Sequence, residues 1–96
     1  MDNKEQIEKN AKSIVPRYMK IEGFPSHDPE INSGAMRVVA GETERHEFWV
    51  TSPTLQLMVL EAYKVVWHSP NDRVRIRFDE QTNEIYRIEI FSELVA

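Results

Sequence analysis

The chain has 96 residues, which is enough for one domain with a modest hydrophobic core. Its formal net charge of −4 argues against non-specific nucleic-acid binding, which depends on basic side chains that neutralise phosphates. Because the chain has no cysteine, disulfides, thiolate zinc sites and cysteine nucleophiles are excluded. The composition, 41% hydrophobic and 29% charged, is typical of a globular protein and not of a disordered one.

The first residues of the chain are polar, and the longest nearly apolar stretch, residues 55–67, contains charged side chains. Neither matches the hydrophobic core of a signal peptide or a segment that spans a bilayer. Small secreted domains are usually stapled by disulfides, which a chain without cysteine cannot form. We therefore expect a cytoplasmic protein of one domain, residues 1–96, with no membrane association.

Residues 2–15 are predicted to form an N-terminal helix. Asp2 and Glu5 have the spacing of an N-terminal capping box. Behind them, apolar residues recur at helical spacing, at Ile7, Ala11, Ile14 and Tyr18. Pro16 lacks a backbone N–H and clashes with the preceding turn, so the helix should end near residue 15.

Residues 20–35 are rich in glycine, proline, serine and asparagine and are predicted to form a long loop. The two prolines within it exclude a central strand there.

Residues 36–50 are predicted to form a β-hairpin with Gly41 in the connection between its strands.

Residues 53–67 are predicted to form a helix, with Ser52 as its N-terminal cap and Pro53 at the first helical position. At about 100° per residue, its few polar residues fall within one arc. These residues are Gln56, Glu61 and Lys64. The helix is therefore expected to be largely buried. Apolar surface that the sheet leaves uncovered would be buried by the N-terminal helix or by a second copy of the chain in a homodimer.

Residues 73–91 are predicted to form a second hairpin, whose turn spans residues 79–84 and places Asn83 in the left-handed conformation. A four-residue turn would set apolar residues of one strand against charged residues of the other, unless a bulge corrects the register. We expect the register that keeps the apolar residues together, in which Arg77 faces Arg87.

The predicted order of elements is helix, two strands, helix, two strands. This α-β-β-α-β-β order is typical of an α+β two-layer sandwich. We expect a four-stranded, mostly antiparallel sheet packed on the buried helix of residues 53–67, with the N-terminal helix at its edge.

The charged face of the last hairpin is the candidate partner-binding surface. Arginine alternates with apolar residues in its first strand, so three guanidinium groups share one face, and the register adds a fourth. Like charges opposite each other destabilise a sheet, so this cluster needs an explanation. The functional explanation is an anionic partner, because guanidinium groups bind carboxylates and phosphates. A solvated sheet face is the structural explanation and the more common one, because charged side chains are frequent on exposed strands. The predicted partner-binding residues are Arg73, Arg75, Arg77 and Arg87, with Trp67 and Phe91 as aromatic anchors.

No catalytic or metal site is predicted, and no cofactor is expected. His27, His46 and His68 lack the close spacing of metal ligands. Glu44 and His46 lie on one side of the first hairpin turn, but no nucleophile or oxyanion hole accompanies them.

These observations favour a small non-enzymatic protein-binding module, such as an inhibitor, immunity-type or adaptor protein of a bacterium or phage, whose partner has an acidic surface. Self-association as a homodimer is an alternative to a separate partner. A second hypothesis is RNA or DNA binding through the arginines of residues 73–77, which the net charge disfavours. A third is a ligand-binding or enzymatic sandwich with a cavity between helix and sheet. Its polar groups would be Glu44, His46 and Tyr63.

Overall fold

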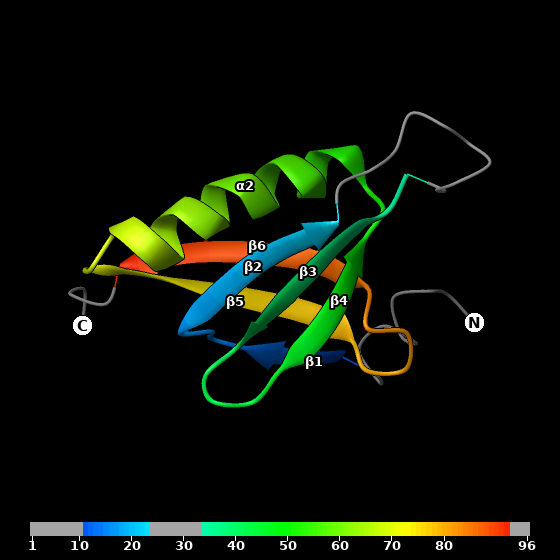
Figure 1. The fold of residues 1–96 in the computed structure, drawn as a ribbon, viewed down its shortest axis with the longest axis horizontal. Helices are drawn as coiled ribbons and strands as arrows, with labels where there is room; N and C mark the ends of the chain where they lie inside the picture. Colours follow the sequence, from blue (N-terminus) through cyan, green and yellow to red (C-terminus); the bar gives the residue numbers. More distant parts are fainter. Residues whose placement is uncertain (1–10, 24–33, 93–96) are drawn as a thin grey trace.

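The computed structural model describes residues 11–23 and 34–92, and within them the chain is an α+β structure (Figure 1). In chain order the elements are β1 (Ala11–Ile14), β2 (Tyr18–Gly23), β3 (Met36–Gly41), β4 (His46–Val50), α2 (Pro53–His68), β5 (Asp72–Asp79) and β6 (Ile85–Ser92). The strands of this part of the chain form two three-stranded antiparallel sheets, with the orders β1–β5–β6 and β2–β3–β4. Figure 1 shows α2 lying along one side of the strands.

The hydrophobic core lies between the two sheets and α2. Alternate residues along β3 and β5 point into it, because successive side chains of a strand lie on opposite faces. Phe48 of β4 and Phe78 of β5 join the two sheets, with ring centroids 4.7 Å apart. No polar or charged side chain is buried in the described part of the chain. The core residues are Met19, Met36, Val38, Ala40, Phe48, Val50, Val59, Ala62, Val74, Ile76, Phe78, Ile85 and Ile88.

The prediction of one four-stranded sheet is wrong, because residues 11–23 add a third strand to each hairpin. β1 pairs with β5 up to Ile14, which lies opposite Ile76, and β2 pairs with β3 from Tyr18 onward. Pro16 lies between the two strands and has no N–H to continue a ladder. The chain therefore leaves one sheet at this point and enters the other.

The predicted helix of residues 2–15 is wrong for residues 11–14, which form β1, and residues 2–10 lie outside the described part. The predicted loop of residues 20–35 is wrong where it overlaps β2, and residues 24–33 also lie outside the described part. Both overlapping segments form strands because each hairpin offers them a hydrogen-bonding edge. These ladders outweigh a weak local helical pattern.

The prediction of a helix over residues 53–67 is confirmed, and α2 ends one residue later. Ser52 Oγ caps it by accepting a backbone N–H at 3.3 Å, and Pro53 is its first residue. The expectation of a largely buried helix is wrong, because only Val59 and Ala62 of α2 are buried. One face of α2 packs on the core, and large apolar side chains of its other face are exposed.

Both predicted hairpins are confirmed, as β3–β4 and β5–β6. In the second hairpin Arg77 faces Arg87, as predicted, and a bulge beside this pair sets Phe78 opposite Ile85. The bulge resolves the register conflict, because it keeps the apolar residues of both strands on the core side. Asn83 adopts the predicted left-handed conformation, with φ of 60°.

Candidate functional site

The outer face of β5 and β6, opposite the core, carries the four arginines predicted to bind a partner. The alternation that buries Val74 and Ile76 of β5 turns the arginines beside them outward. β6 contributes one more arginine, a glutamate and an aromatic ring to the same face. We call this surface the arginine face, and it consists of Arg73, Arg75, Arg77, Arg87, Glu89 and Phe91.

Glu89 organises two of these arginines. Its carboxylate accepts a hydrogen bond from Arg77 Nε at 2.7 Å and lies 3.6 Å from Arg87 Nη2. The hydrogen bond from Arg77, together with the charges of the neighbouring arginines, lowers the pKa of Glu89 below its usual value. Glu89 therefore ionises more readily than a free glutamate, and it pairs with Arg77 through a hydrogen bond and with Arg87 through a longer contact.

Arg75 makes no ion pair with a carboxylate in the described part of the chain. Its guanidinium carbon lies 5.1 Å from the centre of the Phe91 ring, which is a cation–π distance. A guanidinium group stacked on a ring keeps its in-plane N–H donors available to a planar anion. Arg75 and Phe91 together are thus suited to bind a carboxylate next to an apolar surface.

Four charged residues on the outer side of β2–β3–β4 neutralise one another. Arg45 Nη2 lies 2.9 Å from Glu22 Oε1, and Arg37 donates a hydrogen bond to Glu47. Contacts of 3.9 Å link the two pairs into one network. Two guanidinium groups there neutralise two carboxylates, whereas on the arginine face Arg75, Arg77 and Arg87 surround the carboxylate of Glu89. Positive charge therefore exceeds negative charge around Glu89.

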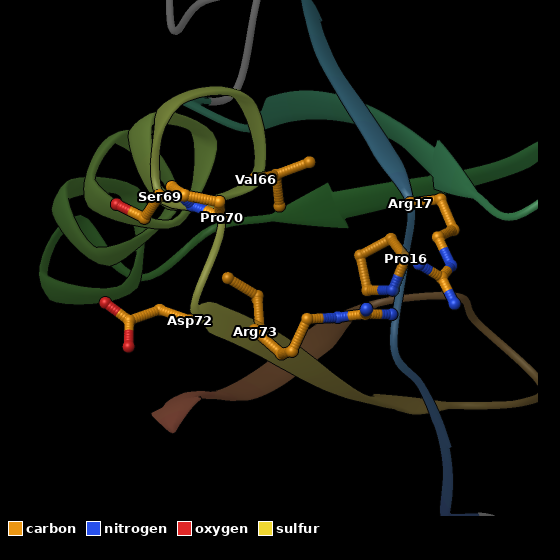
Figure 2. A pocket seen from close by; sticks show the side chains of 8 residues that line it. Pro16, Arg17, Val66, Ser69, Pro70, Asp72 and Arg73 are labelled. Carbon is orange, nitrogen blue, oxygen red and sulfur yellow. The ribbon is translucent and has the colours of Figure 1, made fainter. Parts of the chain in front are cut away.

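One end of the arginine face adjoins a pocket of about 170 Å³ beside the end of α2 (Figure 2). The β1–β5 ladder stops at Ile14 and the chain turns away at Pro16, which opens a gap beside the first residues of β5. Figure 2 shows the Arg73 side chain extending towards Pro16, with Arg17 beyond it, while Asp72 points away. The pocket is lined by Pro16, Arg17, Val66, Ser69, Pro70, Asp72, Arg73 and Val74.

Arg17 is a pocket residue that sequence reasoning does not predict. Its place beside Arg73 depends on the corner at which residues 11–23 change sheets, and its backbone N–H donates to Gly41 O at 2.8 Å. No local pattern around Arg17 indicates this position, because it follows from pairing with two distant hairpins.

Trp67, which the sequence predicts as an aromatic anchor for these arginines, does not lie on the arginine face. It belongs to α2, which packs on the core side of β5 and β6, whereas the arginines lie on the outer side. Its indole N–H donates to Met19 O of β2 at 2.7 Å, and its ring centroid is 6.4 Å from that of Tyr63. Phe91 is therefore the predicted aromatic residue that the structure places beside the arginines.

The candidate acid–base pair of the first hairpin turn has a structural role. The Glu44 carboxylate accepts N–H hydrogen bonds from Glu42 at 3.4 Å and Thr43 at 3.3 Å, and lies 3.2 Å from His46 Nε2. Backbone N–H groups, first its own and then that of Glu42, lower the pKa of Glu44 to about 2. Neither Glu44, His46 nor Tyr63 lines the pocket beside α2.

Within residues 11–23 and 34–92, no group of three or more histidine, aspartate or glutamate side chains is placed to hold a metal ion. The same residues include no helix with the length and apolar character needed to cross a bilayer.

Comparisons with known proteins give little guidance. No protein-family model and no solved structure matches the chain. A malate synthase of Streptomyces arenae is 32% identical over 62 residues, which cover 58% of this chain. The chain spans only 11% of that enzyme's length, which is too small a share to transfer its activity.

Proposed function

We propose that this chain is a small non-enzymatic protein-binding module, of the inhibitor, immunity or adaptor kind, that binds an acidic segment of a partner protein in the cytoplasm. The observation that carries the proposal is the unbalanced charge of the arginine face, compared with the neutralised network on the other sheet. Arg75 is central to it, because this residue lies over the Phe91 ring and, among the described residues, acts on Glu89 through its charge without a salt bridge to it.

Preorganisation supports this use of the face. Arg77 and Arg87 are held by Glu89, and Arg75 rests on Phe91, so less side-chain freedom is lost when a partner binds. Guanidinium groups in fixed positions bind carboxylates with two parallel hydrogen bonds, which adds geometric specificity. An aromatic ring among them supplies the apolar contact typical of an interface hot spot.

The pocket supports a longer binding site. Arg73 belongs both to the arginine face and to the pocket, so a segment that crosses the face can continue into it. The pocket is lined by two basic residues, one acidic residue and apolar side chains, namely Arg17, Arg73, Asp72, Val66 and Val74. We expect it to accept an acidic residue or a chain-terminal carboxylate that has a short apolar neighbour.

Binding of RNA or DNA through the same face is the second candidate. The arginines and the Phe91 ring favour it, because nucleic-acid surfaces combine cations with stacking aromatics. The net charge of −4 and the presence of one aromatic residue on the face disfavour it. The two candidates predict different results: nucleic-acid binding should weaken steeply as salt rises and should favour DNA over an acidic peptide, whereas protein binding should favour the peptide.

The test compares the variant Arg75→Glu, Arg77→Glu with a control of equal charge, Lys20→Glu, Arg45→Glu, on the outer face of the other sheet. Binding to a fluorescent polyglutamate peptide is measured by anisotropy, with circular dichroism as the check of folding. We expect wild type and control to bind alike and the arginine-face variant to bind about tenfold more weakly or worse. The neutral variant Arg75→Gln should give an intermediate loss.

Three results would count against the proposal. Equal loss in the control would mean that net charge, and not this face, drives binding. Unchanged binding by the arginine-face variant would exclude the face altogether. Tighter binding of duplex DNA than of the peptide, with a steep fall as salt rises, would place the nucleic-acid candidate first. If the peptide result holds, capture from a lysate with the same variants identifies the natural partner.

A further inference from the structure

The outward face of α2 carries most of the large apolar side chains that the described part of the chain leaves exposed. Leu57 is 66% exposed, Leu60 36%, Tyr63 38% and Trp67 50%. The other large exposed apolar residues of this part are Trp49 and Ile90, on two separate strands. Isolated apolar residues are common on protein surfaces, but a cluster on one element marks an interaction site.

These four residues form one stripe along the helix, which we call the α2 stripe. Their spacing of three or four residues places them within an arc of about 120° on α2, on the side turned away from buried Ala62. The hydrogen bond from Trp67 to Met19 O and the neighbouring Tyr63 ring hold the end of the stripe in place. The stripe therefore presents a row of large apolar side chains along the helix, with the polar residues Gln56 and Lys64 between them.

The charges beside the stripe indicate which partner fits it. Around the helix, Lys64 lies between Leu60 and Leu57, and Glu61 lies just beyond Leu57. Both side chains are well exposed, and Lys64 Nζ is 3.7 Å from Glu61 Oε1. Two copies of α2 packed antiparallel are related by a two-fold axis midway between Ala62 and Tyr63. That axis places Glu61 of each copy opposite Lys64 of the other, which gives two equivalent pairs of opposite charge. A surface that complements itself in this way is what a two-fold dimer requires.

From these observations we infer that the α2 stripe is a homodimer interface, in which α2 packs antiparallel against α2 of a second copy. A helix of 16 residues is about 24 Å long, so the stripe buries less area than a standard interface of about 800 Å² per partner. The dimer is therefore weak, with a dissociation constant on the order of micromolar. The arginine faces lie on the opposite side of the sheet from α2, so both remain accessible in the dimer and would engage a multivalent acidic partner together.

Reversing the charge of Glu61 or of Lys64 tests the inference. We would measure sedimentation equilibrium of the wild type, of E61K, of K64E, and of an equimolar mixture of the two variants, with circular dichroism as the folding control. Each variant alone places like charges opposite each other and should dimerise at least tenfold more weakly than wild type. The mixture places only positive charge against only negative charge and should recover dimers of one copy of each.

The mixture separates contact between copies from the Glu61–Lys64 pair within one helix. That internal pair is lost in both variants, and mixing cannot restore it. A second test replaces an apolar residue: L57K should abolish dimers, whereas the matched variant W49K, on β4 and outside the stripe, should leave them intact.

A wild type that stays monomeric at about a hundred times the expected dissociation constant would overturn the inference. So would a mixture that stays monomeric while the wild type dimerises, because another surface would then form the dimer. The arginine-face variants should dimerise as the wild type does, so the outcome is independent of the acidic-partner proposal.

Discussion

The contact between Phe48 and Phe78 allows a direct test of how the two sheets are joined. Phe48 is 1% exposed and comes from β4, whereas Phe78 is 7% exposed and comes from β5. Their ring centroids are 4.7 Å apart with an interplanar angle of 57°, a favourable tilted arrangement. Because the rings belong to different sheets, their mutual energy measures contact between the sheets and not the strength of either hairpin.

The size of the effect follows from burial and ring contact. Each single substitution to leucine keeps a large apolar side chain and should lower the free energy of unfolding by about 1–2 kcal/mol. For a chain of this size, a loss of 1 kcal/mol lowers the midpoint of thermal unfolding by roughly 4–8 °C. The ring pair contributes about 0.5–1.5 kcal/mol beyond its burial, and this part is lost only once. The double variant should therefore be less destabilised than the sum of the single variants by that amount.

The assay is urea unfolding of the wild type, Phe48→Leu, Phe78→Leu and the double variant, followed by circular dichroism. The control cycle pairs Phe48→Leu with Leu57→Ala, because Leu57 lies on the exposed side of α2. We expect the control effects to add to within about 0.3–0.5 kcal/mol. If the Phe48 and Phe78 effects were equally additive, the rings would not be in contact and the shared core described above would be refuted.

Three further outcomes follow from local contacts. Gly41→Ala should lower the free energy of unfolding by about 1–3 kcal/mol, because an added Cβ would lie 2.3 Å from the backbone oxygen of Glu44. Gly23→Ala should change this free energy little, because the nearest atom to its added Cβ is 3.4 Å away. Thermal melts of the two variants test the difference. Since the pKa of Glu44 is lowered from 4.5 to about 2, this carboxylate adds stability above pH 4.5 that is lost as the pH falls through 2. Glu44→Gln should therefore be less stable than the wild type at pH 7, and the difference should shrink as the pH falls from 4.5 through 2 in urea titrations; a difference that stayed constant with pH would contradict this. Trp67→Phe should lower the free energy of unfolding by about 1 kcal/mol, because a phenyl ring keeps part of the packing but has no N–H to donate to Met19 O. An unchanged melting temperature, measured at low protein concentration, would argue against that hydrogen bond.

Local chemistry was sufficient to predict the elements whose hydrogen bonds or turns are local. Ser52 and Pro53 marked the start of α2, because a capping oxygen and a first-turn proline act within one helical turn. The alternation of arginine with apolar residues predicted β5 and its outward arginine face, because a strand with one face on a core must alternate. Asn83 marked the left-handed turn residue for an equally local steric reason.

The sequence by itself thus determined the α+β class, the position of α2, both hairpins and the arginine face. Only the tertiary structure decided that residues 11–23 form two strands, that Pro16 divides them between two sheets, and that Arg17 meets Arg73 in a pocket. It also decided that α2 keeps an exposed stripe and that Trp67 turns to β2 instead of the arginines. The physical reason is that a strand has no hydrogen bonds of its own. Its partners lie at distant positions in the chain, and no pattern within the strand specifies which edge it will join.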